Sequence, residues 1–160
     1  MSLDISIKTK RITKLINTSF RVASSQDLDQ ILAIENRAYQ YPWNKEKFAD
    51  SFNNPNVSIQ LILHNEQIIG YLLTLQSLEF IDILNICIDP KFQQQGFGKQ
   101  LLDNFLELQN KGVKSVFLEV RESNGVAINF YQHRGFELID TRKKYYSNGE
   151  NAKILRLQIT

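Results

Sequence analysis

The chain has 160 residues, of which 42% are hydrophobic and 22% are charged, and it carries a formal net charge of +2 at pH 7. This composition is typical of a soluble globular protein, and the length suits one domain with a full hydrophobic core. The 19 basic and 17 acidic residues leave no electrostatic footprint for nucleic acid, so direct nucleic-acid binding is not expected. The sequence shows no apolar run of membrane-spanning length and no signal peptide, so we expect a cytoplasmic protein without a membrane partner.

The single cysteine, Cys87, cannot form an internal disulfide. It lies in an apolar run, which favours a buried structural thiol over a nucleophile. Cysteine and histidine do not cluster with the spacing of zinc ligands, so no metal is expected. The densest basic run, Arg142-Lys143-Lys144, is short and is interpreted as a solvated strand end.

The first half of the chain predicts one strand, two helices and then three strands. Tyr39–Trp43 contains a proline and separates the two helices. A polar turn at Asn65-Glu66 joins two β-like runs into a hairpin. The predicted elements are a strand at Ser19–Ala23, a helix capped by Ser24 or Ser25, a helix at Lys45–Phe52 capped by Asn44, and strands at Val57–His64, Gln67–Leu75 and Phe80–Ile88.

The second half alternates helices and strands before it ends in two strands. The main helix is expected to end at Lys111-Gly112, and the next helix at Gly135. The predicted elements are helices at Lys99–Asn110 and Gly125–His133, and strands at Val113–Val120, Phe136–Thr141 and Ala152–Ile159. The apolar face of the main helix is expected to consist of Phe97, Leu101, Leu102, Phe105, Leu106 and Leu108.

This order predicts an α+β fold, with a mixed, mostly antiparallel sheet flanked by helices. A doubly wound sheet is excluded because it needs strict alternation of strands and helices. The domain is expected to span residues 18–160, and residues 1–17 are expected to form a weakly patterned N-terminal extension.

The most informative segment lies between the predicted strand at Phe80–Ile88 and the main helix. Gln93-Gln94-Gln95-Gly96-Phe97-Gly98 places glycines at a turn that opens a helix. The unpaired N–H groups of a helix start attract phosphate, and glycine lets a ligand approach the backbone. Ordinary turn chemistry is the alternative interpretation of the two glycines.

A second set of polar residues follows in the strand and helix after it. Glu119 interrupts an apolar strand, where a buried charge is costly without a purpose. Alternation puts Glu119 on the face opposite Leu118 and Val120. Asn124 is a good helix N-cap, and Tyr131, two turns later, lies on the same helix face. The alternatives are an ion pair of Glu119 at a strand edge and core packing of Tyr131.

Several segments together resemble successive motifs of the RimI-type ribosomal-protein alanine N-acetyltransferases, a branch of the GNAT superfamily. The resemblance runs from about Arg21 to the C-terminus. It rests on Arg21-Val22-Ala23 with Asp27-Leu28, Tyr41-Pro42-Trp43, Asn85-Ile86-Cys87-Ile88-Asp89-Pro90, Gln93-x-x-Gly96-x-Gly98, Leu118-Glu119-Val120-Arg121-x-Ser123-Asn124, Phe130-Tyr131-x-x-x-Gly135-Phe136 and Lys144-Tyr145-Tyr146.

The resemblance implies direct transfer of an acetyl group from acetyl-CoA to an amine in a ternary complex, with no metal. It implies that Glu119 is the general base and that Tyr131 is the general acid that protonates the departing thiolate. The implied coenzyme contacts are the backbone of Ile86, Cys87 and Ile88 for pantetheine and the thioester, Gln93, Gln94, Gln95, Gly96, Phe97, Gly98 and Lys99 for pyrophosphate, and Asn124, with Tyr131, for the pantetheine end.

The implied acceptor is the N-terminal alanine of a ribosomal protein, bound by a monomer or weak dimer. Candidate acceptor contacts are Tyr41, Trp43, Asp82, Tyr145 and Tyr146, although Asp82 also fits a surface position and Trp43 a core position. Gln94 and Gln95 stand where many relatives have a basic residue, and Lys99 is the substitute charge. The open alternatives are a lysine, polyamine, antibiotic or aminoacyl-tRNA acceptor, and a non-catalytic acyl-CoA sensor.

Overall fold

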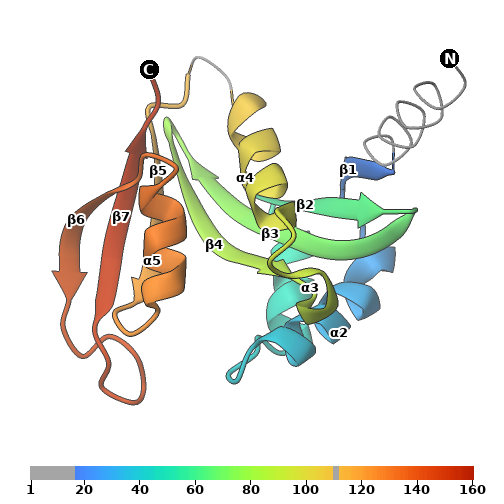
Figure 1. The fold of residues 1–160 in the computed structure, drawn as a ribbon, viewed down its shortest axis with the longest axis horizontal. Coiled ribbons are helices and arrows are strands. Elements are labelled where there is room, and N and C mark those ends of the chain that lie inside the picture. The colour runs from blue at the N-terminus through green and yellow to red at the C-terminus, as the bar shows by residue number, and fades with distance from the viewer. Residues whose placement is uncertain (1–16, 110–111) are drawn as a thin grey trace, which may run out of the picture. The chain divides into compact units, whose positions relative to one another are not determined.

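The computed structural model describes residues 17–109 and 112–160. In this part of the chain, seven strands form one sheet in the order β1-β2-β3-β4-β5-β7-β6 (Figure 1). The strands are β1 Thr18–Val22, β2 Val57–His64, β3 Gln67–Ser77, β4 Phe80–Ile88, β5 Ser115–Arg121, β6 Glu137–Arg142 and β7 Ala152–Gln158. The helices are α2 Leu28–Ala38, α3 Lys45–Asn53, α4 Phe97–Glu107 and α5 Gly125–Gln132, with short 3-10 helices η1 Ser25–Asp27 and η2 Pro90–Phe92.

The sheet is mixed, as the sequence predicts. β4 and β5 are parallel, and their register runs from the Phe80–Ser115 pair to the Ile83–Leu118 pair. β1 with β2, β5 with β7, and β6 with β7 are antiparallel. The predicted α+β class and order of elements are therefore confirmed, and the two 3-10 helices are additions that the sequence pattern does not indicate.

The chain divides into two compact units. Within its described residues, the first consists of residues 17–73 and 85–108, and the second of residues 74–84, 109 and 112–160. In the first unit, Leu61 and Leu63 of β2 pack into a core with α2 and α3. His64 points to the other face, where its ring lies 5.2 Å from that of Phe97 at the start of α4. The sheet of this unit is therefore covered on both faces (Figure 1).

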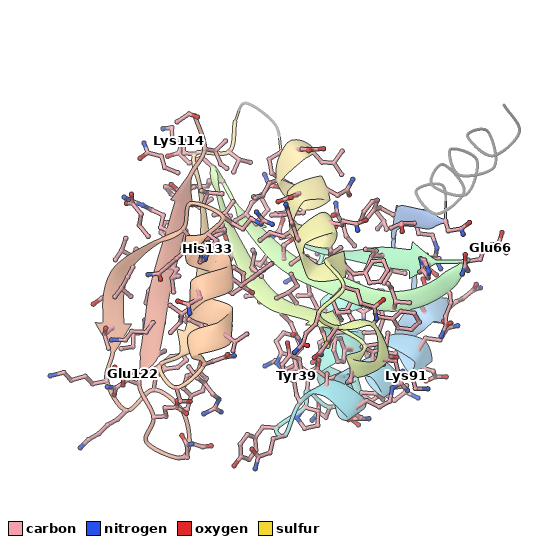
Figure 2. All side chains as sticks on the ribbon, viewed as in Figure 1. Tyr39, Glu66, Lys91, Lys114, Glu122 and His133 are labelled. Carbon is pink, nitrogen blue, oxygen red and sulfur yellow. The ribbon has the colours of Figure 1, made fainter. Side chains whose placement is uncertain are left out.

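The predicted hairpin between β2 and β3 is confirmed. Asn65 and Glu66 both have positive φ, at 50° and 65°. Two consecutive residues of this kind form the tight turn whose twist matches the flanking strands. Glu66 marks the tip of this hairpin (Figure 2).

The second unit is built on β5, β7 and β6, with α5 joining β5 to β6. Leu118 and Val120 of β5 are buried, whereas Glu119 between them is exposed. Tyr131 of α5 packs its ring 5.5 Å from that of Phe136. Gly135 has a φ of +89°, a conformation that favours glycine, and it follows the end of α5 as predicted.

Two predictions about α4 are corrected. The helix begins at Phe97, before the predicted Lys99, and ends at Glu107. The N–H of Leu108 is shared between the carbonyls of Asn104 and Phe105, which tightens the last turn. Leu108 is consequently 60% exposed and does not belong to the buried helix face. The predicted end at Asn110 and the stop residue Lys111 lie outside the described residues, as do residues 1–16 of the predicted extension.

The other boundaries shift by a few residues. β3 extends to Ser77, and β5 begins at Ser115 rather than Val113. None of the helices in residues 17–109 and 112–160 is long and apolar enough to cross a membrane. The same described residues contain no group of three or more histidine, cysteine, aspartate or glutamate side chains that could hold a metal ion.

Candidate functional site

The loop after β4 is shaped by its own glutamines. The Gln93 amide donates to the carbonyl of Ile88 at 2.9 Å, and the Gln95 amide donates to the carbonyl of Lys91 at 3.3 Å. Gln94 and Gly96 have positive φ, at 60° and 85°. These bonds and turns bring the chain from the end of β4 directly into α4.

The start of α4 has the features of an anion site. Its N-cap, Gly96, provides no side-chain oxygen to the helix, and the first helical N–H bonded to it is that of Gln100 at 3.1 Å. The N–H groups of Phe97, Gly98 and Lys99 precede that bond, so they belong to the set of helix-start donors that a phosphate group can occupy. This geometry fits the predicted phosphate loop.

An ion pair between a half-exposed arginine and a buried aspartate holds the beginning of this loop, and sequence reasoning missed it. Arg37 of α2 contacts the carboxylate of Asp89 at 2.6 Å, and the N–H of Lys91 donates to the same carboxylate at 3.1 Å. Asp89 is only 2% exposed. Burial acts to raise the pKa of Asp89, but the bonds from Arg37 and the Lys91 N–H outweigh it and hold the pKa below its usual value.

The strand before the loop contains the lone thiol. Cys87 is buried, as predicted, and burial raises the pKa of its thiol to about 12. A thiol with this pKa is protonated near neutral pH and is a poor nucleophile. Beside it, the carbonyl of Ile86 accepts a hydrogen bond from the Tyr39 hydroxyl.

In the second unit, Glu119 belongs to an exposed polar cluster, which corrects the expectation of a buried charge. Its side chain is 33% exposed, and its Oε1 accepts from Arg142 of β6 at 2.7 Å. A hydrogen bond to Glu119 also raises the pKa of the Tyr145 hydroxyl. In the sequence, the partner of Glu119 is visible only as the first residue of the basic run Arg142-Lys143-Lys144. The interpretation of this run as a solvated strand end is therefore incomplete, because Arg142 pairs with Glu119.

Asp82 joins this cluster from β4. It is paired in register with Phe117, two residues before Glu119, so both carboxylates rise from the same face of the sheet. Burial, followed by the negative charge of Glu119, raises the pKa of Asp82, whereas Arg142 lowers it. Two carboxylates, a guanidinium and a phenol therefore lie together, an arrangement that can receive an amine and take its proton.

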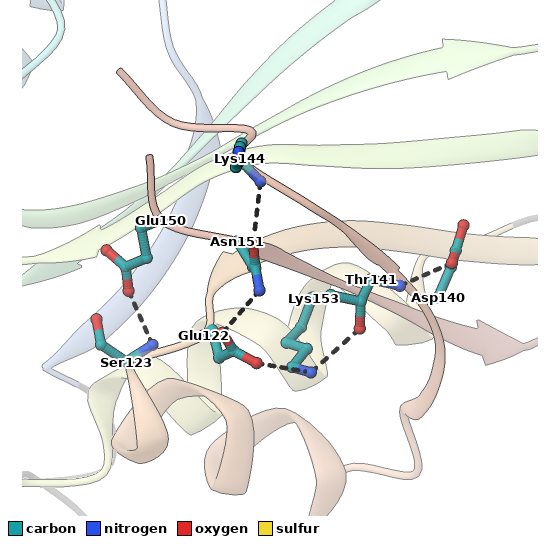
Figure 3. Close-up of polar contacts among 8 residues, drawn as sticks. All are labelled: Glu122, Ser123, Asp140, Thr141, Lys144, Glu150, Asn151 and Lys153. Carbon is teal, nitrogen blue, oxygen red and sulfur yellow. Dashed lines mark hydrogen bonds and ion pairs between the residues drawn. The ribbon is translucent and has the colours of Figure 1, made fainter. Parts of the chain in front are cut away.

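The connection between β6 and β7 is held by hydrogen bonds to the turn after β5 (Figure 3). Glu150 accepts from the N–H of Ser123 at 2.9 Å, and Asn151 donates to Glu122 at 3.1 Å. Lys153 bridges Glu122 at 3.0 Å and Thr141 at 3.1 Å. This network fixes the segment that contains Tyr145 and Tyr146.

Asn124 and Tyr131 occupy α5. The Asn124 side chain accepts from the N–H of Ala127 at 3.1 Å, which confirms it as the N-cap. Tyr131 is 6% exposed, and burial raises its pKa above the ordinary value of a phenol. Within the described residues, no hydrogen bond is made by its hydroxyl, which therefore remains available as a donor.

The four aromatic residues predicted to contact the acceptor are divided between the two units. Tyr41 of the first unit is 66% exposed, whereas Trp43 packs its ring 5.4 Å from that of Phe48 and lies partly in the core. Tyr145 and Tyr146 of the second unit stack edge to face at 5.2 Å, and Arg121 lies 3.9 Å from the Tyr146 ring centre. Of the predicted site residues, Asp82, Glu119 and Tyr145 form one cluster in the second unit. In the first unit, Ile88 and Gln93 are linked by a hydrogen bond between the end of β4 and the loop before α4.

Comparison with known proteins places these features in a family. Residues 28–136 match the acetyltransferase (GNAT) family. The chain is 35% identical over 138 residues to the [ribosomal protein bS18]-alanine N-acetyltransferase of Escherichia coli strain K12, covering 84% of this chain and 93% of that protein. It is 37% identical over 134 residues to the enzyme of the same name from Haemophilus influenzae, covering 81% and 90%.

A solved structure shows the same fold. The crystal structure of the ribosomal-protein-S18-alanine N-acetyltransferase from Escherichia coli superposes with a TM-score of 0.83 at 32% identity. The match covers 89% of this chain and 94% of that one. The likeness in sequence and in fold thus extends over most of both proteins.

Proposed function

This chain belongs to the GNAT acetyltransferase family, and we propose that it transfers the acetyl group of acetyl-CoA to the N-terminal alanine of a ribosomal protein. The observation that carries the acceptor assignment is the identity of 35–37% over more than four fifths of the chain to enzymes named for the alanine of ribosomal protein bS18. The proposed catalytic unit is a single domain over residues 18–160, acting as a monomer or weak dimer.

The chemistry of the acceptor favours an α-amine over a lysine. The amine must be neutral to attack the thioester, and an α-amino group has a pKa of about 8, against about 10.4 for lysine. Near neutral pH, the free base of an α-amine is therefore roughly a hundredfold more abundant. One carboxylate is then enough to accept the proton that the amine nitrogen gives up when it forms the amide bond.

We assign that carboxylate to Glu119. The amine nitrogen attacks the thioester carbonyl carbon, and its proton passes to Glu119, directly or through a water molecule. Arg142 occupies Oε1 of Glu119, and Asp82 lies nearby to attract the amine. Tyr145 and Tyr146, fixed by the network in Figure 3, are the proposed acceptor contacts of this unit.

Tyr131 is assigned to the leaving group. When the carbon–sulfur bond breaks, the coenzyme A sulfur takes up negative charge, and the Tyr131 hydroxyl donates its proton to it. The raised pKa of Tyr131 keeps this hydroxyl protonated until that charge forms. The protonated, buried thiol of Cys87 supports direct transfer without an acyl-enzyme.

The coenzyme would bind through the backbone of Ile86–Ile88 and through residues 93–99. The helix-start donors of Phe97, Gly98 and Lys99 suit pyrophosphate oxygens. Asn124 is the proposed pantetheine contact from α5.

The test is release of free coenzyme A thiol from acetyl-CoA in the presence of two peptides. One is an alanine-starting ribosomal peptide, and the other is the same peptide blocked at its N-terminus but carrying free lysines. We expect turnover only with the free N-terminus. Turnover with the blocked peptide would instead identify lysine as the acceptor. Tight acetyl-CoA binding without turnover on either peptide would reject both the N-terminal amine and lysine as acceptors, and would favour a small-molecule acceptor or a non-catalytic sensor.

A further inference from the structure

The first unit contains a buried carboxylate that has no role in the chemistry proposed above. Glu35 of α2 is 1% exposed. Within the described residues, neither lysine nor arginine forms an ion pair with it. Burial removes the water that would solvate this charge, so hydrogen bonds from the protein must take the place of that water.

Three donors converge on this carboxylate from three parts of the chain. The backbone N–H of Trp43 donates to Oε1 at 2.9 Å, and the amide of Asn85 in β4 donates to Oε2 at 3.0 Å. The hydroxyl of Tyr71 in β3 also donates to Oε2. Burial raises the pKa of Tyr71 far above its usual value, so this hydroxyl remains a donor. Glu35 thus links α2, the α2–α3 connection and two strands.

A second bond ties the other end of the same connection to the same strand. Tyr39, which follows α2, donates its hydroxyl to the carbonyl of Ile86, next to Asn85. The connection is therefore fixed at Tyr39 and at Trp43, and only residues 40–42 lie between the two tethers. Tyr41, in that interval, is 66% exposed.

We infer that Glu35 is a positioning residue that fixes the Tyr39–Trp43 segment against β4 and so holds Tyr41 ready for the acceptor peptide. This inference rests on the proposed function, because it assumes that Tyr41 contacts the acceptor peptide and that the backbone of Ile86–Ile88 contacts the thioester. A rigid link between Tyr41 and the Ile86–Ile88 backbone would set the distance from the acceptor amine to the acetyl group. A small change in this distance slows the reaction severely.

The test compares three variants with the wild-type enzyme. Glu35→Met removes every bond to the carboxylate. Glu35→Gln keeps an oxygen for the Trp43 N–H but loses the charge that strengthens this bond. Tyr71→Phe is the matched control, since it removes one donor of the same network and leaves the bond to Trp43 in place.

We expect the KM for an alanine-starting peptide to rise about tenfold in Glu35→Met and about threefold in Glu35→Gln, with the KM for acetyl-CoA within about twofold of wild type. Tyr71→Phe should lose stability but keep the wild-type peptide KM. Should Glu35→Met fail to fold, the comparison between Glu35→Gln and Tyr71→Phe decides. Equal peptide KM values in these two variants would overturn the inference.

A second measurement does not depend on the acceptor. Trp43 is the only tryptophan of the chain, so intrinsic fluorescence reports on this segment alone. Acrylamide should quench it more strongly in the Glu35 variants than in Tyr71→Phe, and equal quenching would overturn the tether. A wild-type enzyme without turnover on any N-terminal peptide would instead overturn the proposed function and the acceptor role of Tyr41 with it.

Discussion

At the scale of single residues, Glu119 is the sharpest test of the proposed chemistry. Glu119→Gln removes the base but keeps the shape of the side chain. We expect kcat/KM to fall by about a hundredfold to ten-thousandfold, with acetyl-CoA binding unchanged. Steady-state kinetics and calorimetric titration of acetyl-CoA would measure this. Glu79→Gln is the control, because Glu79 is ion-paired to Lys114 at 2.7 Å, outside the acceptor contacts, and has no proposed catalytic role. Equal losses in both variants would contradict the assignment.

The pH profile tests Tyr131. As pH rises, kcat/KM should increase while the acceptor α-amine loses its proton near a pKa of about 8, and should then level off. Burial raises the pKa of Tyr131, so its hydroxyl should stay protonated through this range and no decrease should follow up to about pH 10. Tyr131→Phe should be slower with the same rising limb. A falling limb below pH 10 that disappears in Tyr131→Phe would refute the prediction.

At the scale of elements, the junction between β1 and α2 depends on one carboxylate. Both terminal nitrogens of Arg21 contact Asp27, at 2.8 and 2.9 Å, and the N–H of Ser24 donates to it as well. The bond from Arg21 is the main reason that the pKa of Asp27 falls to about 2. Because the folded pKa is depressed, this stabilisation is present above the unfolded pKa near 4 and is lost as pH falls towards 2.

Asp27→Asn should therefore lower the free energy of unfolding by about 1 kcal/mol at pH 7, and the difference should shrink between pH 4 and pH 2. Urea unfolding at several pH values would measure it. Asp29→Asn is the control, because Asp29 is largely exposed and contacts Lys45 only at 3.6 Å. A stability difference for Asp27→Asn that does not change with pH would show that the ion pair is not its source.

Strands β3 and β4 meet closely at Gly70. A Cβ at this position would lie 2.6 Å from the carbonyl oxygen of Cys87 and 2.5 Å from Cδ1 of Ile88. Gly70→Ala should push β4 out of place, lower the free energy of unfolding by about 2–3 kcal/mol and raise the KM for acetyl-CoA. Denaturation and kinetics would show both effects. Gly112→Ala, with open space around the new Cβ, should show neither. Unchanged acetyl-CoA kinetics in Gly70→Ala would argue against coenzyme binding by this strand.

At the scale of the whole molecule, local patterns predicted the elements, and tertiary contacts decided what the patterns could not show. Alternation in Val57–His64 and the turn residues Asn65-Glu66 suffice for a hairpin. Periodicity in α4 could not reveal that the helix ends before Leu108, because the end depends on a shift in backbone bonding. The partner of Glu119 was hidden for a different reason: Arg142 is 23 residues away and meets it only through the pairing of β5, β7 and β6.

The same limit applies to Glu35 and Asp89. Their partners Asn85 and Arg37 are 50 and 52 residues away in sequence. A single sequence contains no periodicity at such distances, whereas phosphate-loop glycines and their helix are contiguous and can be recognised locally. A phosphate-binding helix start can therefore be predicted from local sequence, whereas the long-range partners of Glu35 and Asp89 become visible only in the fold.

The stability of the whole protein should respond to the phosphate groups of coenzyme A. A ligand that binds only the folded state adds about 2.7 kcal/mol at one hundred times its Kd, which is about 5–10 °C in Tm for a chain of this size. Coenzyme A should produce such a shift, whereas pantetheine, which lacks the pyrophosphate, should produce little at equal concentration. We propose that backbone N–H groups at the start of α4 bind these phosphates, and in that case moderate salt should weaken the shift only slightly. Thermal unfolding would measure this, and an equal shift with pantetheine would mean that the α4 start does not bind the coenzyme.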